Sequence, residues 1–385
     1  MIKQRDFIVF SDDWGRLPFS CQHIMKHFLN SNRIAWVNTI GMRSPKLTAY
    51  DVKRSFEKLR MCLSSGSNNK HYHPNLTILN PFIIPYNHIS AIRFFNKNLV
   101  VKKVKNVMLN LGIKKPIVLT TFPNAVDYIH AFEEIADIYY CVDDFTNWPG
   151  VNQDLVRTME EKLLDECDLV LATSKELCLK KERKGKKPVL LPHGVDFDHF
   201  RSGYREDKMP ETLRGIPKPI IGFFGTISPW LDFDLMIDMA NARPDWSFVF
   251  LGPADTDIKD LAKFGNVYFV GKVPYEALPE YAVAFDVATI PFLVNELTVS
   301  VNPLKILEYL ACGLPVVTTN LPEIRKFSDL VYIADGPLDF IENIKRALSE
   351  NSEKLKARRI EEARKHSWGS VAENFSLLIE KLYPI

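Results

Sequence analysis

Short apolar runs alternate with longer helical patterns along the first half of the chain. The runs predict strands at residues 7–10, 34–37, 76–79, 117–120, 138–142, 169–172 and 189–191. Apolar positions at helical spacing predict helices at residues 21–30, 90–111, 151–166 and 174–181. This alternation is typical of a parallel α/β sheet.

A second series of the same kind fills the rest of the chain. It predicts strands at residues 219–224, 247–251, 267–270, 287–290, 315–318 and 331–333. A polar segment with Pro and Gly separates the two series and predicts a linker at residues 198–218. We therefore predict two Rossmann-like domains facing each other across a cleft. Ligands of such sheets bind at the carboxyl ends of strands, so functional residues are expected just after strands.

The composition agrees with this architecture. At 385 residues the chain is long enough for two domains, and 46% hydrophobic with 25% charged residues is typical of a soluble globular protein. Its six cysteines include no Cys-x-x-Cys pair, which favours reduced thiols in the cytoplasm over disulfides or a zinc site. The N-terminus lacks a signal-peptide pattern, and no apolar run approaches the ~20 residues of a membrane span.

Residues 302–319, NPLKILEYLACGLPVVTT, are the most informative segment. Pro303 is predicted as the first helical residue and Gly313 as a left-handed helix end. The helix start would offer free N–H groups and a positive dipole end to an anion, and Lys305 adds a full charge. Glu308 lies one turn later on the same face, where its carboxylate can accept hydrogen bonds from two hydroxyls. A phosphate with a diol one turn away describes a nucleoside diphosphate, although the same pattern also suits a helix that only packs an α/β domain.

This segment resembles the donor site of GT-B glycosyltransferases, especially glycosyltransferase family 4 and related enzymes of bacterial surface-polysaccharide synthesis. LPHGVDFDHF at residues 191–200 is similar to the family's linker-entry motif, with His193 in place of the usual Asn. ADIYYCVDDF at residues 136–145 resembles a segment that usually ends in His-Asp-Phe. The resemblance implies an N-terminal acceptor-binding domain at residues 1–199, completed by a C-terminal helix at 366–385. It also implies a donor-binding domain at 200–365, a UDP- or GDP-linked sugar as substrate, no cofactor and no bound metal.

Several further residues are expected to contact the donor. Gly225 and Thr226 follow a buried strand and would let the backbone approach a phosphate. Val273 and Tyr275 belong to the turn that lies along the nucleobase in the relatives. The diphosphate is expected at the helix start, and the donor sugar at the preceding loop, through residues Thr298, Ser300, Asn302, Pro303 and Leu304.

Two departures from the family pattern bear on the chemistry. The family's Arg and Lys after the glycine turn are missing here, because the segment reads SPWLDFD, so Lys305 becomes more important. The family's second Glu, eight positions before the ribose Glu, is replaced by Ser300.

The acceptor is expected at two polar clusters in the first half. Asp12, Asp13, Trp14 and Arg16 follow the first strand and combine charges with an aromatic face, which suits a sugar. In the second cluster, Asp143 and Asp144 follow another apolar strand, and we expect one of them to face the ligand and the other to anchor the loop. Either aspartate is a candidate base or acceptor-orienting group.

A basic segment at residues 86–115 carries seven cations and no acidic residue. Its apolar positions approximate a helical stripe made of Ile92, Phe95, Leu99, Val100, Val104, Val107 and Leu111. Such a helix can lie on anionic lipid, which favours a peripheral location at the inner membrane leaflet and a lipid-linked acceptor. Nucleic acid is the poorer interpretation, because no binding motif accompanies the charge.

The sequence thus favours a cytoplasmic glycosyltransferase that moves a sugar from a nucleotide-diphosphate donor to a lipid-linked or glycan acceptor. The overall resemblance favours retention, whereas the missing second Glu and Asp143 in place of the family's His favour inversion. Two alternatives remain: a nucleotide-sugar epimerase of the same fold, and a non-catalytic GT-B subunit that binds a partner transferase.

Overall fold

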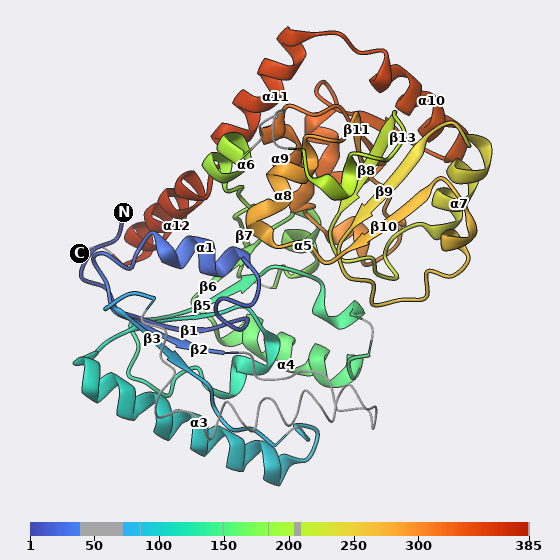
Figure 1. The fold of residues 1–385 in the computed structure, drawn as a ribbon. Helices are drawn as coiled ribbons and strands as arrows, with labels where there is room; N and C mark the ends of the chain where they lie inside the picture. The colour runs from blue at the N-terminus through green and yellow to red at the C-terminus, as the bar shows by residue number, and fades with distance from the viewer. Residues whose placement is uncertain (39–71, 85, 149, 184, 204–208, 384–385) are drawn as a thin grey trace. The chain divides into compact units, whose positions relative to one another are not determined.

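The computed structural model describes residues 1–38, 72–84, 86–148, 150–183, 185–203 and 209–383, and the chain divides into two compact units (Figure 1). Unit 1 contains Met1–Pro192 and Ala372–Ile385, and unit 2 contains His193–Val371. The sequence placed these boundaries at 199 and 366 instead. The difference arises because Val195 pairs with Ser367 inside unit 2, and because residues 197–203 pack on the helix that starts at Leu304.

Unit 1 is built on a seven-stranded parallel sheet in the order β3-β2-β1-β4-β5-β6-β7 (Figure 1). Its strands are β1 (Phe7–Phe10), β2 (Ile34–Val37), β3 (Leu76–Leu79), β4 (Ile117–Thr120), β5 (Ala136–Cys141), β6 (Leu169–Ala172) and β7 (Val189–Leu190). β1, β2, β4, β5 and β6 are buried along their whole length. Strands covered on both faces read as continuous apolar runs, which explains why the sequence located them well.

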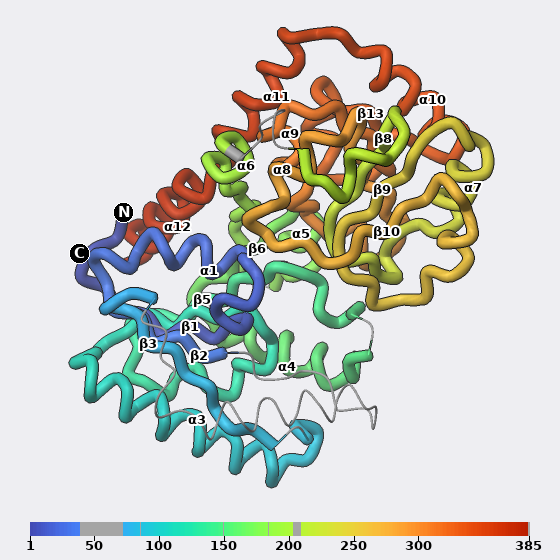
Figure 2. Tube along the Cα trace, viewed as in Figure 1, coloured from blue at the N-terminus to red at the C-terminus, as the bar shows by residue number. Residues whose placement is uncertain are grey.

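The helices of unit 1 are α1 (Ser20–Lys26), α3 (Ser90–Leu111), α4 (Gln153–Glu166) and α5 (Lys175–Lys180). α4 and α5 begin at the capping residues Asn152 and Ser174, whose side chains accept hydrogen bonds from backbone N–H groups. The final helix, α12 (Trp368–Leu382), lies beside the N-terminal segment in the chain trace (Figure 2). The rings of Phe375 and Phe28 are 5.7 Å apart there, which ties the C-terminal segment to unit 1.

Unit 2 is built on a six-stranded parallel sheet in the order β10-β9-β8-β11-β12-β13. Its strands are β8 (Ile220–Phe224), β9 (Ser247–Leu251), β10 (Val267–Gly271), β11 (Val287–Ile290), β12 (Val316–Thr319) and β13 (Tyr332–Ala334). The helices are α6 (Phe197–Gly203), α7 (Phe233–Ala242), α8 (Leu278–Ala282), α9 (Leu304–Cys312), α10 (Pro337–Leu348) and α11 (Glu353–Lys365). α6 begins the segment that the sequence assigned to a linker, and residues 204–208 of that segment lie outside the described residues.

Each unit has its own apolar core. In the part of the chain that the structure describes, no helix combines the length and apolar character that a membrane crossing needs.

Candidate functional site

The order of strands reverses at one point in each sheet, between β1 and β4 in unit 1 and between β8 and β11 in unit 2. Loops that leave neighbouring strands in opposite directions open a crevice at such a point, and ligands of α/β sheets bind there. Asp12 to Arg16 follow β1, Gly225 and Thr226 follow β8, and residues 298–305 follow β11. These candidates therefore lie at the two topologically favoured positions, whereas Asp143 and Asp144 follow β5.

α9 positions the main candidates of unit 2. The helix starts at Leu304 with Pro303 as the residue before it, so Pro303 is not the first helical residue that the sequence predicted. Its end at Gly313 is confirmed: φ is 77° there, and the N–H groups of Gly313 and Leu314 donate to the carbonyls of Leu310 and Tyr309 at 2.9 and 3.1 Å. The N-terminal end of α9 therefore points its first N–H groups toward the loop that follows β11.

Glu308 is a buried carboxylate with open hydrogen-bonding capacity. Only 6% of its surface is exposed, and its oxygens accept no hydrogen bond from any residue that the structure describes. Burial raises the pKa of Glu308 to about 7, and the nearby charge of Lys305 offsets only part of that effect. Burial also lowers the pKa of Lys305, although the nearby charge of Glu308 acts to raise it. A carboxylate held in this state can accept hydrogen bonds from a ligand without first giving up partners of its own.

Lys305 extends from α9 across the glycine turn after β8. Gly225 has φ of 144°, and a Cβ at this position would lie 2.2 Å from Cε and 2.8 Å from Nζ of Lys305. The adjacent turn after β9 closes on it, because a Cβ on Gly252 would lie 2.0 Å from the Gly225 carbonyl oxygen. Glycine is required at both positions, and the absence of side chains lets the ammonium group of Lys305 rest on backbone. A phosphate bound there would meet one cation and a helix start together.

Tyr275 and Val273 follow β10 and are half-buried, as is Thr226 after β8. The Tyr275 ring stacks on His199 of α6 with centroids 4.7 Å apart, and the His199 Nε2 lies 3.1 Å from the Tyr275 carbonyl oxygen. Burial and the charge of Glu308 raise the pKa of Tyr275. Sequence reasoning missed His199; its one signal was its place in the linker-entry motif.

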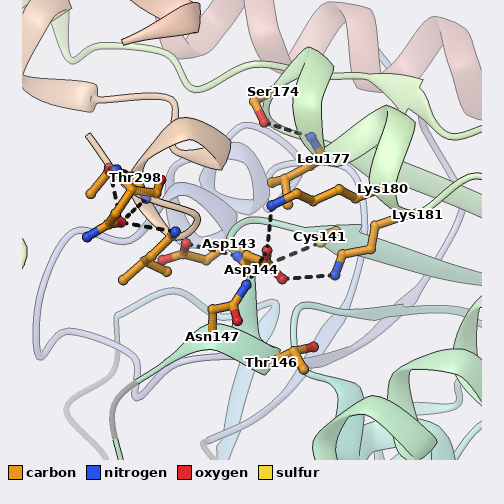
Figure 3. Close-up of polar contacts among 12 residues, drawn as sticks. Cys141, Asp143, Asp144, Thr146, Asn147, Ser174, Leu177, Lys180, Lys181 and Thr298 are labelled. Atoms are coloured by element: carbon orange, nitrogen blue, oxygen red, sulfur yellow. Dashed lines mark hydrogen bonds and ion pairs between the residues drawn. The ribbon is translucent and has the colours of Figure 1, made fainter. Parts of the chain in front are cut away.

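The loop after β11 holds Thr298, Ser300 and Asn302, all buried. The Thr298 hydroxyl accepts from the Asn295 N–H at 3.0 Å and also contacts the Leu293 carbonyl (Figure 3). These bonds close the loop on itself, so we leave Thr298 out of the proposed ligand contacts. Ser300 and Asn302 remain candidates.

The two adjacent aspartates of unit 1 have different environments. Asp144 is 3% exposed and accepts from Lys180 and Lys181, each at 3.1 Å, and from Asn147 at 3.0 Å (Figure 3). Burial alone would raise the pKa of Asp144, but the two lysines lower it below its usual value. Asp144 is thus fully engaged as an anchor of its loop.

The lysine cluster continues into the core of unit 1. Lys181 also donates to Glu160 of α4 at 2.9 Å, and Glu160 accepts from Tyr139 of β5 at 2.8 Å. This network could not be predicted from the sequence, because its members lie on α4, on β5 and at the end of α5, far apart in the chain.

Asp143 is half-buried, and one of its oxygens accepts the N–H of Asp144 at 2.9 Å. Burial raises the pKa of Asp143 to about 6, although that N–H and the Trp148 side chain lower it. A carboxyl group with a pKa close to neutrality suits proton transfer. Of the two aspartates, Asp143 is therefore the candidate for chemistry.

The loop after β1 carries a similar carboxyl group. Burial and the charge of Asp13 raise the pKa of Asp12 to about 7. Arg16 is exposed and its Nη1 lies 4.0 Å from Asp13 Oδ2. The Trp14 ring is 9% exposed and packs edge-on against Trp36 at 4.8 Å, so it supports the loop and offers little ring face to a sugar.

None of the predicted site residues joins a cluster of three His, Cys, Asp or Glu ligands within the described parts of the chain. Of the chain's one His-x-His pair, His71 lies outside the described residues, and His73 Nδ1 accepts from the Asn75 N–H at 3.1 Å.

Known proteins resemble this chain in two ways: a family model matches the sequence of unit 2, and solved structures match the fold. Residues 218–350 match the family described as glycosyl transferases group 1. A protein of Bacillus subtilis (strain 168), provisionally named a teichuronic acid biosynthesis glycosyltransferase (TuaH), is 30% identical over 227 residues. That match covers 56% of this chain and 57% of the relative, so it spans little more than half of either protein.

Solved structures resemble nearly the whole chain. HepE of Anabaena, in complex with UDP and glucose, superposes with a TM-score of 0.67 at 14% identity, covering 98% of this chain and 99% of that one. Sucrose-phosphate synthase of Thermosynechococcus elongatus gives 0.72 at 14% identity, covering 99% of each chain. The E. coli trehalose-6-phosphate protein bound to UDP-2-fluoro glucose gives 0.63 at 13% identity, with 99% of each chain covered. The predicted resemblance and the predicted GT-B fold are confirmed.

Proposed function

Because residues 218–350 match the group 1 glycosyl transferases and the chain has the GT-B fold, we propose that this protein is a nucleotide-sugar-dependent glycosyltransferase. The reaction would move a sugar from a UDP-linked donor to a lipid-linked or oligosaccharide acceptor in surface-polysaccharide synthesis. UDP is favoured over GDP because HepE and the E. coli trehalose-6-phosphate protein hold UDP or a UDP-sugar. The role in polysaccharide synthesis rests on the partial match to the Bacillus relative.

The proposal rests mainly on the environment of Glu308. A buried carboxylate that accepts no hydrogen bond from the described residues is costly to fold around, so a ligand is the reason to keep it. The ribose of a nucleotide presents two hydroxyl donors at the spacing of a carboxylate's two oxygens. Lys305 and the turn at Gly225 and Thr226 would then receive the diphosphate, one helical turn away.

The same groups would promote the departure of the diphosphate. When the bond between the anomeric carbon and the phosphate oxygen breaks, negative charge develops on the leaving group. The ammonium group of Lys305 and the N–H groups at the start of α9 are fixed opposite that charge before the reaction begins. Pro303 has no N–H to contribute, so we assign this role to Asn302, Leu304 and Lys305.

Unit 1 would bind the acceptor through Asp143 and the Asp12–Arg16 loop. Asp143 would orient the acceptor hydroxyl or take its proton, while Asp144 holds the loop. We propose retention, following the family resemblance, and NMR of the product anomer tests it.

Asp143→Asn should lower the transfer rate by about 10²- to 10⁴-fold with little change in stability. Its matched control, Asp144→Asn, should mainly destabilise the fold; equal loss of activity without loss of stability in both variants would contradict these roles.

Residues 86–115 support a peripheral membrane contact. α3 buries Asn96, Val100, Val104 and Met108 at intervals of four, so the predicted apolar stripe is confirmed at Val100 and Val104 but is wrong at Phe95 and Leu99. Those two side chains are exposed together with Phe94 and Leu109. The exposed cations of the helix are Lys97, Lys102 and Lys105, whereas Arg93 pairs with Asp127 at 2.6 Å. An apolar and cationic surface of this kind suits anionic lipid.

Vesicle binding tests the contact. Reversing two charges, Lys102→Glu with Lys105→Glu, should weaken binding to anionic vesicles by more than 10-fold, since each cation near the surface contributes about 1 kcal/mol. Lys187→Glu, an exposed change in unit 1, is the control. Equal binding to neutral and anionic vesicles would refute an electrostatic contact.

A donor screen tests the function itself. Thermal unfolding is followed with UDP-, GDP-, dTDP- and CMP-sugars, and a donor at about 100 times its Kd should stabilise the protein by about 2.7 kcal/mol. We expect a UDP-sugar to stabilise and its transfer to require an acceptor. Conversion of the donor without an acceptor would favour an epimerase, and no stabilisation by any donor would favour a non-catalytic partner subunit.

A further inference from the structure

Three potential metal ligands converge at the start of β5. This is the end of the sheet opposite to the one where Asp143 lies. They are His130, Glu134 and Asp137, and one nitrogen or oxygen atom from each lies within 4.8 Å of the others. Asp137 is the second residue of β5, and the other two lie on the turn that precedes the strand. The proposed glycosyl transfer uses none of them.

Three of the four carboxylate oxygens of this cluster are buried without a hydrogen bond. Asp137 is 1% exposed, and neither of its oxygens has a hydrogen-bond partner. Oε1 of Glu134 is in the same state, while its Oε2 accepts from the Phe132 N–H at 2.8 Å. Buried oxygens of ionised carboxylates are strongly destabilising unless a positive charge meets them. The described residues supply one candidate for that charge, the imidazole of His130.

His130 is oriented as a metal ligand would be. Its Nδ1 lies 2.8 Å from Asp137 Oδ2, close enough for an ion pair when the ring is protonated, and its Nε2 lies 3.8 Å from Oε2 of Glu166. In metal sites the nitrogen that does not bind the ion commonly directs its N–H to a carboxylate, which fixes the ring. His130 also has φ of 57°, a left-handed conformation that an ordinary residue adopts only when its surroundings hold it there.

We propose that His130, Glu134 and Asp137 bind one divalent transition-metal cation, for which Zn²⁺ is the best fit. Nδ1 of His130 and one oxygen from each carboxylate would give three of the four ligands of a tetrahedral ion, with water as the fourth. The imidazole selects against Mg²⁺ and Ca²⁺, which take oxygen ligands. No metal site was expected from the sequence, because these three residues form no recognisable spacing motif.

The cation would have a structural role. It would neutralise the buried carboxylates and fasten the turn at residues 130–134 to β5. The rival occupant is a proton shared by the carboxyl groups of Glu134 and Asp137, and the absence of Zn²⁺ binding by the full chain would favour it.

The experiment uses the full chain after treatment with a chelator. Calorimetric titration with Zn²⁺ should give one site per chain, and Mg²⁺ and Ca²⁺ should give none. His130→Asn should weaken Zn²⁺ binding at least 10-fold, since even outer-sphere changes commonly cost that much. Asn tolerates the left-handed conformation, so the variant is expected to fold. The exposed His88→Asn is the matched control and should bind as the parent does.

Asp137→Asn separates a ligand from a merely structural residue. The metal-free variant should be at least as stable as the metal-free parent, because a buried charge is removed, but Zn²⁺ should no longer raise its Tm. Bound Co²⁺ should give a visible absorption band in the parent and none in either cluster variant. The proposal fails if the parent binds Zn²⁺ no more tightly than His130→Asn, or if all the variants bind it equally.

Discussion

Asp144 and Glu308 are two buried carboxylates of similar exposure, at 3% and 6%, in opposite electrostatic environments. Asp144 has two lysines and an asparagine within hydrogen-bonding distance, and its pKa lies below the usual value. Glu308 accepts no hydrogen bond from the described residues, and burial raises its pKa to about 7. Burial alone therefore does not distinguish a structural carboxylate from a ligand-binding one. The number of hydrogen bonds that its oxygens accept within the protein does.

The two carboxylates also have opposite effects on the stability of the fold. Asp144 stabilises unit 1 at neutral pH, because a carboxyl group whose folded pKa is depressed favours folding above its unfolded pKa. That contribution is lost as the pH falls through the folded pKa. Glu308 destabilises unit 2 at neutral pH, because its folded pKa is raised. Functional sites commonly hold such unfavourable groups at the expense of stability.

The largest effect is expected from removing a cation of the Asp144 cluster. Lys181→Met should lower the free energy of unfolding by roughly 3–5 kcal/mol, because it leaves Glu160 buried without that partner while Lys180 still pairs with Asp144. Urea unfolding measures it. Lys187→Met, at a side chain that is 84% exposed, should change stability by less than about 0.5 kcal/mol. A loss below 1 kcal/mol for Lys181→Met would contradict the assignment of the cluster to the fold.

The opposite sign is expected for Glu308→Gln. A folded pKa raised to about 7 corresponds to roughly 3 kcal/mol of destabilisation at pH 8, which the neutral side chain relieves. The gain should be absent near pH 4, grow as the pH rises toward 7 and stay constant above it. Urea unfolding across this pH range measures it, with the exposed Glu276→Gln as control. A Glu308→Gln variant less stable than the parent at pH 8 would show that the carboxylate has partners in the fold.

A smaller effect is expected at the turn beneath Lys305. Gly225→Ala should cost about 1–3 kcal/mol, because φ of 144° strains any side chain, and it should weaken UDP binding about 10-fold by displacing the Lys305 amine. Gly265→Ala, where a Cβ meets open space, should change neither property. Thermal unfolding with and without UDP measures both. An unchanged UDP affinity in Gly225→Ala would remove Lys305 from the diphosphate site.

The sequence predicted the framework better than the contacts. Buried parallel strands are continuous apolar runs, so each predicted strand corresponds to an observed one, and Gly313 ends α9 where expected. The segment after Asp198 was predicted less well. Its polar composition indicated a linker, but α6 occupies its start because Phe200 packs into the core of unit 2. Its ring also meets the Tyr275 ring.

The candidate site shows the same limit. Glu308 and Lys305 could be predicted because they lie three residues apart on one helix. The choice between Asp143 and Asp144 could not, because it depends on Lys180 and Lys181 at the end of α5, which come 36 and 37 residues after Asp144. The cluster of His130, Glu134 and Asp137 was equally hidden, since a left-handed turn brings its side chains together.

The most direct test of the account is a double-mutant cycle between Glu308 and the ribose hydroxyls. Calorimetry at pH 8 measures the Kd of UDP and of its 2′-deoxy and 3′-deoxy analogues, with the parent and with Glu308→Gln. A hydrogen bond to a charged group contributes about 1.5–3 kcal/mol, so the parent should bind at least one deoxy analogue roughly 10- to 100-fold more weakly than UDP. In Glu308→Gln that difference should largely disappear. If both proteins lose the same affinity on removal of each hydroxyl, Glu308 does not bind the ribose and the central claim is wrong.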